Sequence, residues 1–173
     1  HQQLVSKQIT CTALVQEKLS FLRQNTHNTV NSLLDTTALD LAKKVDTKIA
    51  NGETIGLLEG IPFGIKDVYM VQGTYTTASS DLLKKYKSAY TATAIQKLLD
   101  AGAIPLVKEN CDSFGHGSSS ENTVFGAVKN AINPSLVGGG SSGGSAVNVA
   151  KDYTVFSIGG DTGGSVRQPA GYN

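Results

Sequence analysis

Two glycine–serine segments decide how this chain is interpreted: Gly138-Gly139-Gly140-Ser141-Ser142-Gly143-Gly144-Ser145-Ala146 and Asp161-Thr162-Gly163-Gly164-Ser165-Val166-Arg167. A lysine lies upstream of both, in Gly60-Ile61-Pro62-Phe63-Gly64-Ile65-Lys66-Asp67. A serine hydroxyl is a weak nucleophile until a neighbouring base takes its proton, and a buried lysine can be that base in its neutral form. Glycines let backbone N–H groups approach a developing oxyanion. The three segments therefore predict a serine hydrolase that needs no histidine and acts on amide bonds.

The same segments resemble the amidase signature family, whose catalytic set is Ser–cis-Ser–Lys. The resemblance implies that Lys66 is the base, that Ser141 is the bridging serine with a cis peptide bond, and that Ser165 is the nucleophile. It also implies an oxyanion hole and a substrate pocket formed by short backbone segments. The predicted oxyanion donors are the N–H groups of Thr162, Gly163, Gly164 and Ser165, and the predicted pocket residues are His116, Gly117 and Ser118.

Within that family, the stretch Cys111–Gly126 looks most like the glutaminase component of tRNA-dependent amidotransferases. This resemblance implies glutamine or another small amide as the substrate, partner subunits in a hetero-oligomer, and tRNA bound through the partner. It further implies that ATP and Mg²⁺ are used by the partner, so we expect no cofactor and no metal in this chain. His116 departs from the related proteins, which usually have methionine at this position.

The chain is long enough for one domain with a sizeable core, and its composition excludes some classes of protein. The 173 residues include 15 basic and 14 acidic side chains, so no broad basic field is available for gripping nucleic acid alone. No run of 18 apolar residues occurs, which argues against a membrane span. Cys11 and Cys111 lie far apart without a CxxC pair, which suggests neither a disulfide framework nor a zinc site. We therefore predict a cytoplasmic or organellar-matrix protein.

The expected organisation is an α/β fold of the amidase signature type, with a mixed sheet covered by helices. Apolar spacing predicts one helix preceded by an N-cap at Thr10 or Thr12, and another over 36–49. Strands are expected over 60–68, 104–107 and 153–158, and further helices over 93–101 and 143–150. Both glycine–serine loops then lie at the ends of elements, where α/β sheets place their ligands.

The expected domain is one unit, 1–173, with a mainly helical lead-in over 1–52 and a catalytic α/β core over 53–173. Members of the resembled family run to several hundred residues, and this chain stops eight residues after Ser165. We therefore expect the chain to be the N-terminal part of a longer protein.

Several alternatives stay open at this point. Gly138-x-Gly140-x-x-Gly143 fits a dinucleotide-binding pattern, but the residues before it make a poor strand. Gly139-x-Ser141-x-Gly143 fits a nucleophile elbow, which needs a histidine later in the chain, and all three histidines precede Ser141. A free-standing amidase for small aliphatic or aryl amides is the main functional alternative. A third functional alternative is that the chain has no catalytic role and acts only in binding or assembly.

Overall fold

The computed structural model describes all 173 residues and contains a four-stranded mixed sheet with strand order β1-β3-β2-β4. Its central strands, β2 (Pro62–Lys66) and β3 (Ile104–Glu109), run parallel, and β4 (Phe156–Ile158) is parallel to β2. The strand β1 (Val30–Leu33) closes the other edge and runs antiparallel to β3. The predicted α/β fold with a mixed sheet is confirmed.

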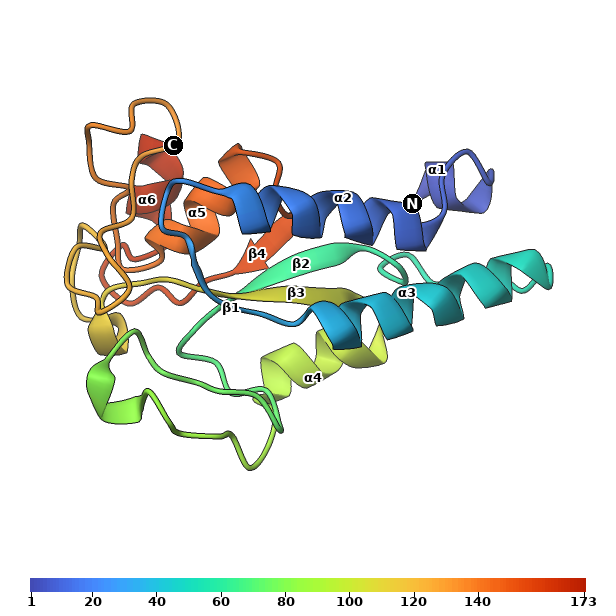
Figure 1. Ribbon diagram of the computed structural model, residues 1–173, viewed down its shortest axis with the longest axis horizontal. Coiled ribbons are helices and arrows are strands. Elements are labelled where there is room, and N and C mark those ends of the chain that lie inside the picture. Colours follow the sequence, from blue (N-terminus) through green and yellow to red (C-terminus); the bar gives the residue numbers. More distant parts are fainter.

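Six α-helices accompany the sheet (Figure 1). They are α1 (Gln2–Val5), α2 (Cys11–Gln24), α3 (Asp35–Ala50), α4 (Thr93–Asp100), α5 (Gly143–Ala150) and α6 (Arg167–Tyr172). Short 3₁₀ turns cover Asp81–Leu83 and Ser113–Gly115. None of the helices combines the length and the apolar character that crossing a membrane requires.

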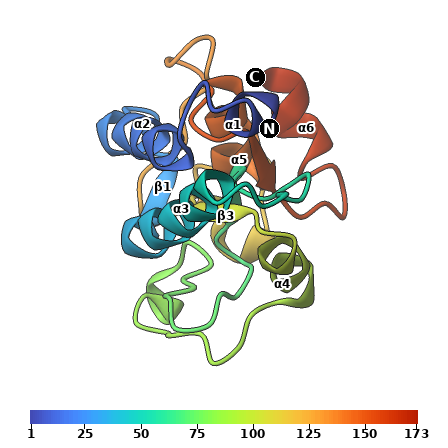
Figure 2. The same ribbon diagram turned by 90° about the vertical axis from the view of Figure 1, so that its right-hand side faces the viewer.

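The two faces of the sheet are covered by different helices because side chains alternate along each strand. Phe63 and Ile65 of β2 pack with Ile95 of α4 on one face. On the other face, Ile104 and Leu106 of β3 pack with the buried residues of α1, α2 and α3. Figure 2 shows α4 on the side of the sheet opposite to α5 and α6. The sheet is therefore buried between two layers.

Most helices begin and end close to where the sequence predicted. Thr10 is the N-cap of α2, where its hydroxyl accepts a hydrogen bond from the N–H of Ala13 at 3.1 Å. The bounds of α5 are those predicted, and α3 and α4 differ from prediction by about one residue. The third predicted strand was too long, because residues 153–155 are bends and β4 begins at Phe156.

The lead-in over 1–52 was predicted to be mainly helical, and it contains α1, α2, α3 and one strand that the sequence did not predict. Val30–Leu33 forms β1, an edge strand whose residues are all partly exposed. Four residues are too few for alternation of apolar and polar side chains to identify a strand. Because β1 pairs with β3, the N-terminal helices are joined directly to the sheet.

The loops predicted to carry function gather at one end of the sheet (left in Figure 1). The three parallel strands β2, β3 and β4 end at Lys66, Glu109 and Ile158, so their carboxyl ends meet at the same edge. The loop before α5 and the loop before α6 lie at this edge as well, since Lys66 at the end of β2 bonds to Ser141 and Gly160. The two loops also contact each other, because Ser142 N–H donates to the C=O of Ser165 at 3.0 Å. Carboxyl ends of parallel strands are the usual ligand-binding edge of such sheets.

Candidate active site

The last residue of β2, Lys66, contacts the first glycine–serine loop. Its Nζ donates a hydrogen bond to Ser141 Oγ at 2.6 Å and a longer one to the C=O of Gly160 at 3.4 Å. Lys66 is 2 % exposed and Ser141 is fully buried. Two of the three residues predicted as a catalytic set are thus in direct contact, although 75 positions separate them in sequence.

Burial lowers the pKa of Lys66 below its ordinary value, because the charged ammonium is poorly solvated there. The carboxylates of Asp112 and Asp161 act in the opposite direction and offset part of that effect. The lysine therefore loses its proton more readily than a surface lysine would. This is the property that a lysine needs to act as a base.

Lys66 could instead have been an ordinary surface lysine paired with the adjacent Asp67, with no catalytic role. The structure contradicts this alternative. Asp67 instead forms a fully buried ion pair with Lys108, with 2.6 Å between Asp67 Oδ1 and Lys108 Nζ. The other carboxylate oxygen of Asp67 accepts hydrogen bonds from the side chains of Thr77 and Asn31. Because Lys108 neutralises Asp67, Lys66 is free to interact with Ser141.

The first glycine–serine loop contains a cis peptide bond between Gly140 and Ser141, which is not an X–Pro bond. The family resemblance implied this geometry at Ser141. The C=O of Ser141 accepts a hydrogen bond from the N–H of Asp112 at 3.1 Å. Gly140 leaves no room for a side chain, because a Cβ there would overlap Asp112 Oδ2.

Asp112 organises the neighbouring loop. Its carboxylate accepts hydrogen bonds from the N–H groups of Ser120 (2.9 Å) and Asn122 (3.2 Å). A Cβ at Gly117 would overlap the carboxylate of Asp112, so this glycine is required for the close approach. Asp112 is therefore a structural residue of this loop.

The second glycine–serine loop is held by Asp161. Its carboxylate accepts backbone hydrogen bonds from Gly164, Val166 and Arg167 at 2.9 to 3.1 Å, and the Arg167 guanidinium forms a two-pronged ion pair with it. These hydrogen bonds, led by that of the Arg167 side chain, hold the pKa of Asp161 well below its usual range. Asp161 and its partner Arg167 therefore hold the loop that carries Ser165.

The third predicted catalytic residue, Ser165, lines a cavity of about 400 Å³ next to the Lys66–Ser141 pair. No hydrogen bond joins the hydroxyls of Ser165 and Ser141. Gly115 connects the two parts of the site, because it lines the cavity and a Cβ on it would lie 3.7 Å from Ser141 Oγ. The cavity has no hydrophobic side chain, and its residues are Gly115, Gly117, Ser118, Gly140, Thr162, Gly163, Gly164, Ser165 and Gln168.

The predicted oxyanion donors differ in whether their N–H groups are free to bind a substrate oxygen. The N–H of Gly164 already donates to Asp161 Oδ1 at 2.9 Å. The N–H groups of Thr162, Gly163 and Ser165 have no hydrogen-bond partner within the chain. Unpaired backbone N–H groups at a cavity wall are suited to bind negative charge.

The three predicted pocket residues are also placed differently from one another. Gly117 and Ser118 line the cavity. The His116 side chain is exposed, and its Nδ1 lies 2.9 Å from the C=O of Phe114. His116 is not among the residues that line the cavity.

Sequence reasoning missed Gln168 and Gly160. Gln168 lines the cavity, and its Oε1 accepts a hydrogen bond from the N–H of Gly140 at 3.3 Å. The C=O of Gly160 accepts hydrogen bonds from Lys66 Nζ and from Ser142 Oγ. Gln168 lies three residues after Ser165, near the start of α6. This closeness to the predicted nucleophile is the sequence signal that could have identified it.

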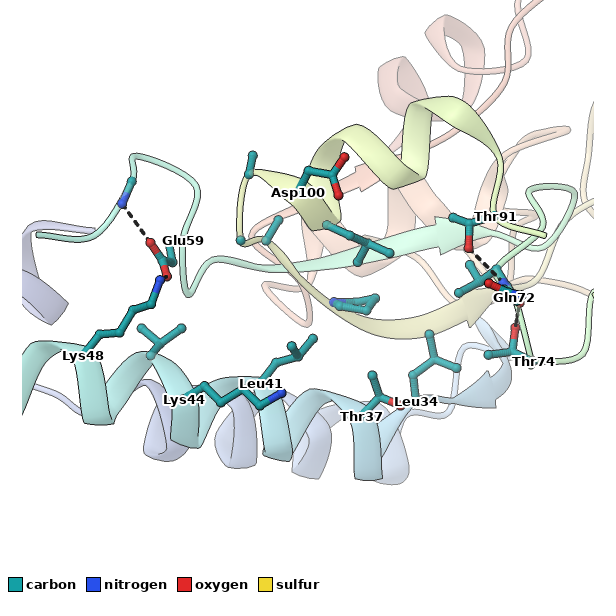
Figure 3. Close-up of a pocket in the computed structure, with 18 residues that line it drawn as sticks. Leu34, Thr37, Leu41, Lys44, Lys48, Glu59, Gln72, Thr74, Thr91 and Asp100 are labelled. Atoms are coloured by element: carbon teal, nitrogen blue, oxygen red, sulfur yellow. Dashed lines mark hydrogen bonds and ion pairs between the residues drawn. The ribbon is translucent and has the colours of Figure 1, made fainter. Parts of the chain in front are cut away.

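A larger hollow of about 760 Å³ lies between α3 and α4, away from the serine loops (Figure 3). Leu34, Thr37 and Leu41 face it from one side, and Asp100 faces it from the other. Its one ion pair joins Lys48 to Glu59 at 2.6 Å. None of the residues predicted for catalysis lines this hollow, so we assign the candidate active site to the smaller polar cavity.

Comparison with known proteins agrees with this assignment. The model of the amidase family matches residues 13–173, so the chain belongs to the amidase family. The A subunit of glutamyl-tRNA(Gln) amidotransferase from Trichormus variabilis is 46% identical over 175 residues, which cover 99% of this chain. The corresponding protein of Gloeothece citriformis is 47% identical over 175 residues, which also cover 99% of this chain. The chain spans 36% of the length of each of these curated relatives.

Solved structures give the same fold. A bacterial aryl acylamidase of the amidase signature family has a TM-score of 0.90 and 30% identity, over 98% of this chain and 36% of that one. The A subunit of glutamyl-tRNA(Gln) amidotransferase from Thermotoga maritima has a TM-score of 0.76 and 33% identity, over 92% of this chain and 33% of that one. The family and the fold predicted from the glycine–serine motifs are confirmed.

Proposed function

We propose that this chain carries the catalytic set of a glutaminase subunit in a tRNA-dependent amidotransferase. The observation that carries the proposal is the buried 2.6 Å contact between Lys66 Nζ and Ser141 Oγ, beside a polar cavity lined by Ser165. The 46% identity to the A subunit of glutamyl-tRNA(Gln) amidotransferase favours glutamine as the amide. A cavity wall without hydrophobic side chains also suits a polar substrate better than an aryl amide.

The first step is the attack of Ser165 on the side-chain amide of glutamine. Neutral Lys66 takes the proton of Ser141 Oγ, while Ser141 Oγ takes the proton of Ser165 Oγ. The Ser165 oxygen then forms a bond to the amide carbon, and the carbonyl electron pair moves onto oxygen. The free N–H groups of Thr162, Gly163 and Ser165 are suited to bind that oxyanion, and each such donor contributes about 3 kcal/mol in comparable enzymes.

Ammonia leaves in the second step. The C–N bond breaks, and the leaving nitrogen receives the proton that Lys66 accepted, through Ser141. A glutamyl ester of Ser165 remains, and water hydrolyses it by the same proton path in reverse. The absence of a hydrogen bond between the two serine hydroxyls does not oppose this role, because catalytic hydrogen bonds are often long until a substrate is bound.

The fate of ammonia belongs to the partner subunits in this proposal. One partner uses the ammonia with ATP and Mg²⁺ to amidate glutamate or aspartate misacylated on tRNA. The near-balanced charge of this chain agrees with tRNA being bound by the partner. The alternative is a free-standing amidase, and the similarity to the aryl acylamidase structure is the observation that favours it.

The test measures ammonia release by the full-length gene product from glutamine and from simple amides. Ser165→Ala is the inactivating variant, and Ser135→Ala, at an exposed serine, is the matched control. Glutamine turnover that Ser165→Ala abolishes, and that increases with partner subunits, supports the amidotransferase. Ser165-dependent turnover of simple amides alone supports the free-standing amidase. Ammonia release that persists in Ser165→Ala contradicts the proposed catalytic set.

A further inference from the structure

A buried carboxylate that the proposed mechanism does not use lies behind both serine loops. Glu109 is the last residue of β3 and is fully buried. It has no ion-pair partner in the chain, whereas the buried carboxylate of Asp67 is paired with Lys108. A buried charge without a countercharge is costly to the fold, so its presence calls for a physical explanation.

Three hydrogen bonds to Glu109 come from two separate elements. Ser145 Oγ donates to Oε2 at 2.6 Å, and Asn148 Nδ2 donates to Oε1 at 2.9 Å, both from α5. Ser157 Oγ donates to Oε1 at 2.7 Å from β4. The carboxylate of Glu109 is therefore the point at which α5 and β4 are joined.

These two elements flank the two serine loops. The helix α5 begins at Gly143, two residues after Ser141. The strand β4 ends at Ile158, two residues before Gly160, whose C=O accepts a hydrogen bond from Lys66. A shift between α5 and β4 would therefore change the position of Ser141 relative to the loop that leads to Ser165.

The middle strand β2 is adapted to this arrangement. β2 lies between β3 and β4, and the side chain of Glu109 must cross it to reach Ser157. It crosses over Gly64, where a Cβ would overlap Glu109 Oε1. Only glycine at position 64 leaves space for the carboxylate. The backbone of Glu109 also holds the end of β2, because its C=O accepts a hydrogen bond from the N–H of Asp67 at 3.0 Å.

We propose that Glu109 is a positioning residue, whose ionised carboxylate holds α5 and β4 at the separation that aligns Lys66, Ser141 and the Ser165 loop. This inference rests on the proposed function and extends it to a residue outside the cavity. We assign this role to the ionised form because it accepts all three hydrogen bonds with the donors oriented as they are. A protonated carboxyl group would make one of these donors reorient.

Few charged groups surround Glu109. No titratable side chain is present in α5, β4 or β1. Lys66 of β2 donates to Ser141 and Gly160, and Lys108 of β3 pairs with Asp67. On α6, which packs on α5, Arg167 pairs with Asp161. The buried residues of α3, which packs on β3, are Ala38, Ala42 and Val45.

Burial raises the pKa of Glu109 to about 7, against the effect of its three hydrogen bonds. The carboxylate form that the positioning role requires therefore forms as pH rises through neutrality. Lys66 also becomes active as pH rises, so the wild-type enzyme has two rising steps. The step that belongs to Glu109 disappears if the side chain cannot ionise.

The experiment compares kcat and KM for ammonia release by the wild type, Glu109→Gln and Ser157→Ala of the full-length protein, across neutral pH. Ser88→Ala is the matched control, because Ser88 is a buried serine whose hydroxyl bonds to Thr76, away from α5 and β4. We expect kcat per folded molecule to fall about tenfold in both test variants, with KM changed less than about twofold. The pH step near neutrality should be absent in Glu109→Gln only.

A second readout does not require turnover, so failure of the proposed function remains distinguishable. Hydrogen–deuterium exchange should become faster in residues 141–150 and 156–165 of both test variants and stay unchanged in Ser88→Ala. If the wild-type protein shows no Ser165-dependent ammonia release, the proposed function is refuted. The hydrogen–deuterium exchange rates then decide the positioning role of Glu109 by themselves. Unchanged exchange in these segments, or a lower melting temperature with unchanged kcat and pH profile, would overturn the positioning role.

Discussion

Lys66 is the residue on which the proposed chemistry depends, because a base must be neutral before it accepts a proton. Its burial replaces water with Ser141 and the C=O of Gly160, and this environment lowers its pKa. In the proposed mechanism, this lowered pKa allows a lysine to act at this position without a histidine.

The first prediction concerns the pH dependence of kcat/KM. Because the neutral amine is the active form, kcat/KM should rise as pH rises through the lowered pKa of Lys66. Lys66→Arg should reduce kcat by about 100-fold or more, because a guanidinium stays charged at all accessible pH values. Steady-state ammonia release across pH measures both effects. A profile that falls with rising pH near neutrality would contradict the role of Lys66.

The second prediction concerns stability and arises from Glu109. Its pKa in the folded protein is about 7, above the ordinary value of 4.5, so between these pH values the folded state binds more protons than the unfolded state. The free energy of unfolding should therefore fall as pH rises through this interval, by about 3 kcal/mol from this group. Denaturant unfolding at several pH values tests it. Glu109→Gln should show a smaller decrease, and an equal decrease would refute the assignment.

At the scale of elements, buried polar groups hold the strand ends that form the site. The Lys108–Asp67 pair joins the end of β3 to the residue after Lys66, and Asp161 holds the loop before α6. These contacts explain how loops rich in glycine can keep fixed positions.

The third prediction is that Lys108→Met destabilises the protein strongly. The substitution leaves the Asp67 carboxylate buried without its cation, which costs about 3 to 5 kcal/mol in comparable cases. Lys85→Met, at an exposed lysine without an ion pair, is the control and should change stability by less than about 0.5 kcal/mol. Urea unfolding gives both values. Equal stability of the two variants would show that the buried pair has no such role.

The fourth prediction concerns the Ser165 loop. Asp161→Ala removes every hydrogen bond that the carboxylate accepts from Gly164, Val166 and Arg167. We expect kcat to fall about tenfold or more, because misplacing a catalytic group by about 1 Å can cost 100-fold. The melting temperature should change little, since Asp161 and Arg167 lie at the surface. Unchanged kcat would mean that the loop keeps its conformation without Asp161.

The same scale shows what the sequence could and could not predict. Glycine, serine and threonine have distinct roles at helix ends, so the N-cap of α2 and the bounds of α5 were predictable. The edge strand β1 was not, because it has only four residues and no clear alternation. Glu109 was not either, because its hydrogen-bond donors lie 36, 39 and 48 residues away in sequence. Local patterns do not show such distant partners.

For the whole molecule, the parallel strands β2, β3 and β4 place Lys66, Ser141 and the Ser165 loop at one edge of the sheet. The hydrophobic clusters on the two faces support this edge from both sides. The site is therefore formed from loops that are distant in sequence and is fixed by the sheet beneath them.

Covalent catalysis by Ser165 is tested most directly by mass spectrometry of the full-length protein, quenched in acid during turnover of glutamine. We predict a fraction of molecules heavier by one glutamyl group, located on the peptide that contains Ser165. Ser165→Ala should carry no such group, and Lys66→Arg should accumulate it far more slowly. A glutamyl group on another residue, or ammonia release that is unchanged in Ser165→Ala, would contradict the proposed chemistry.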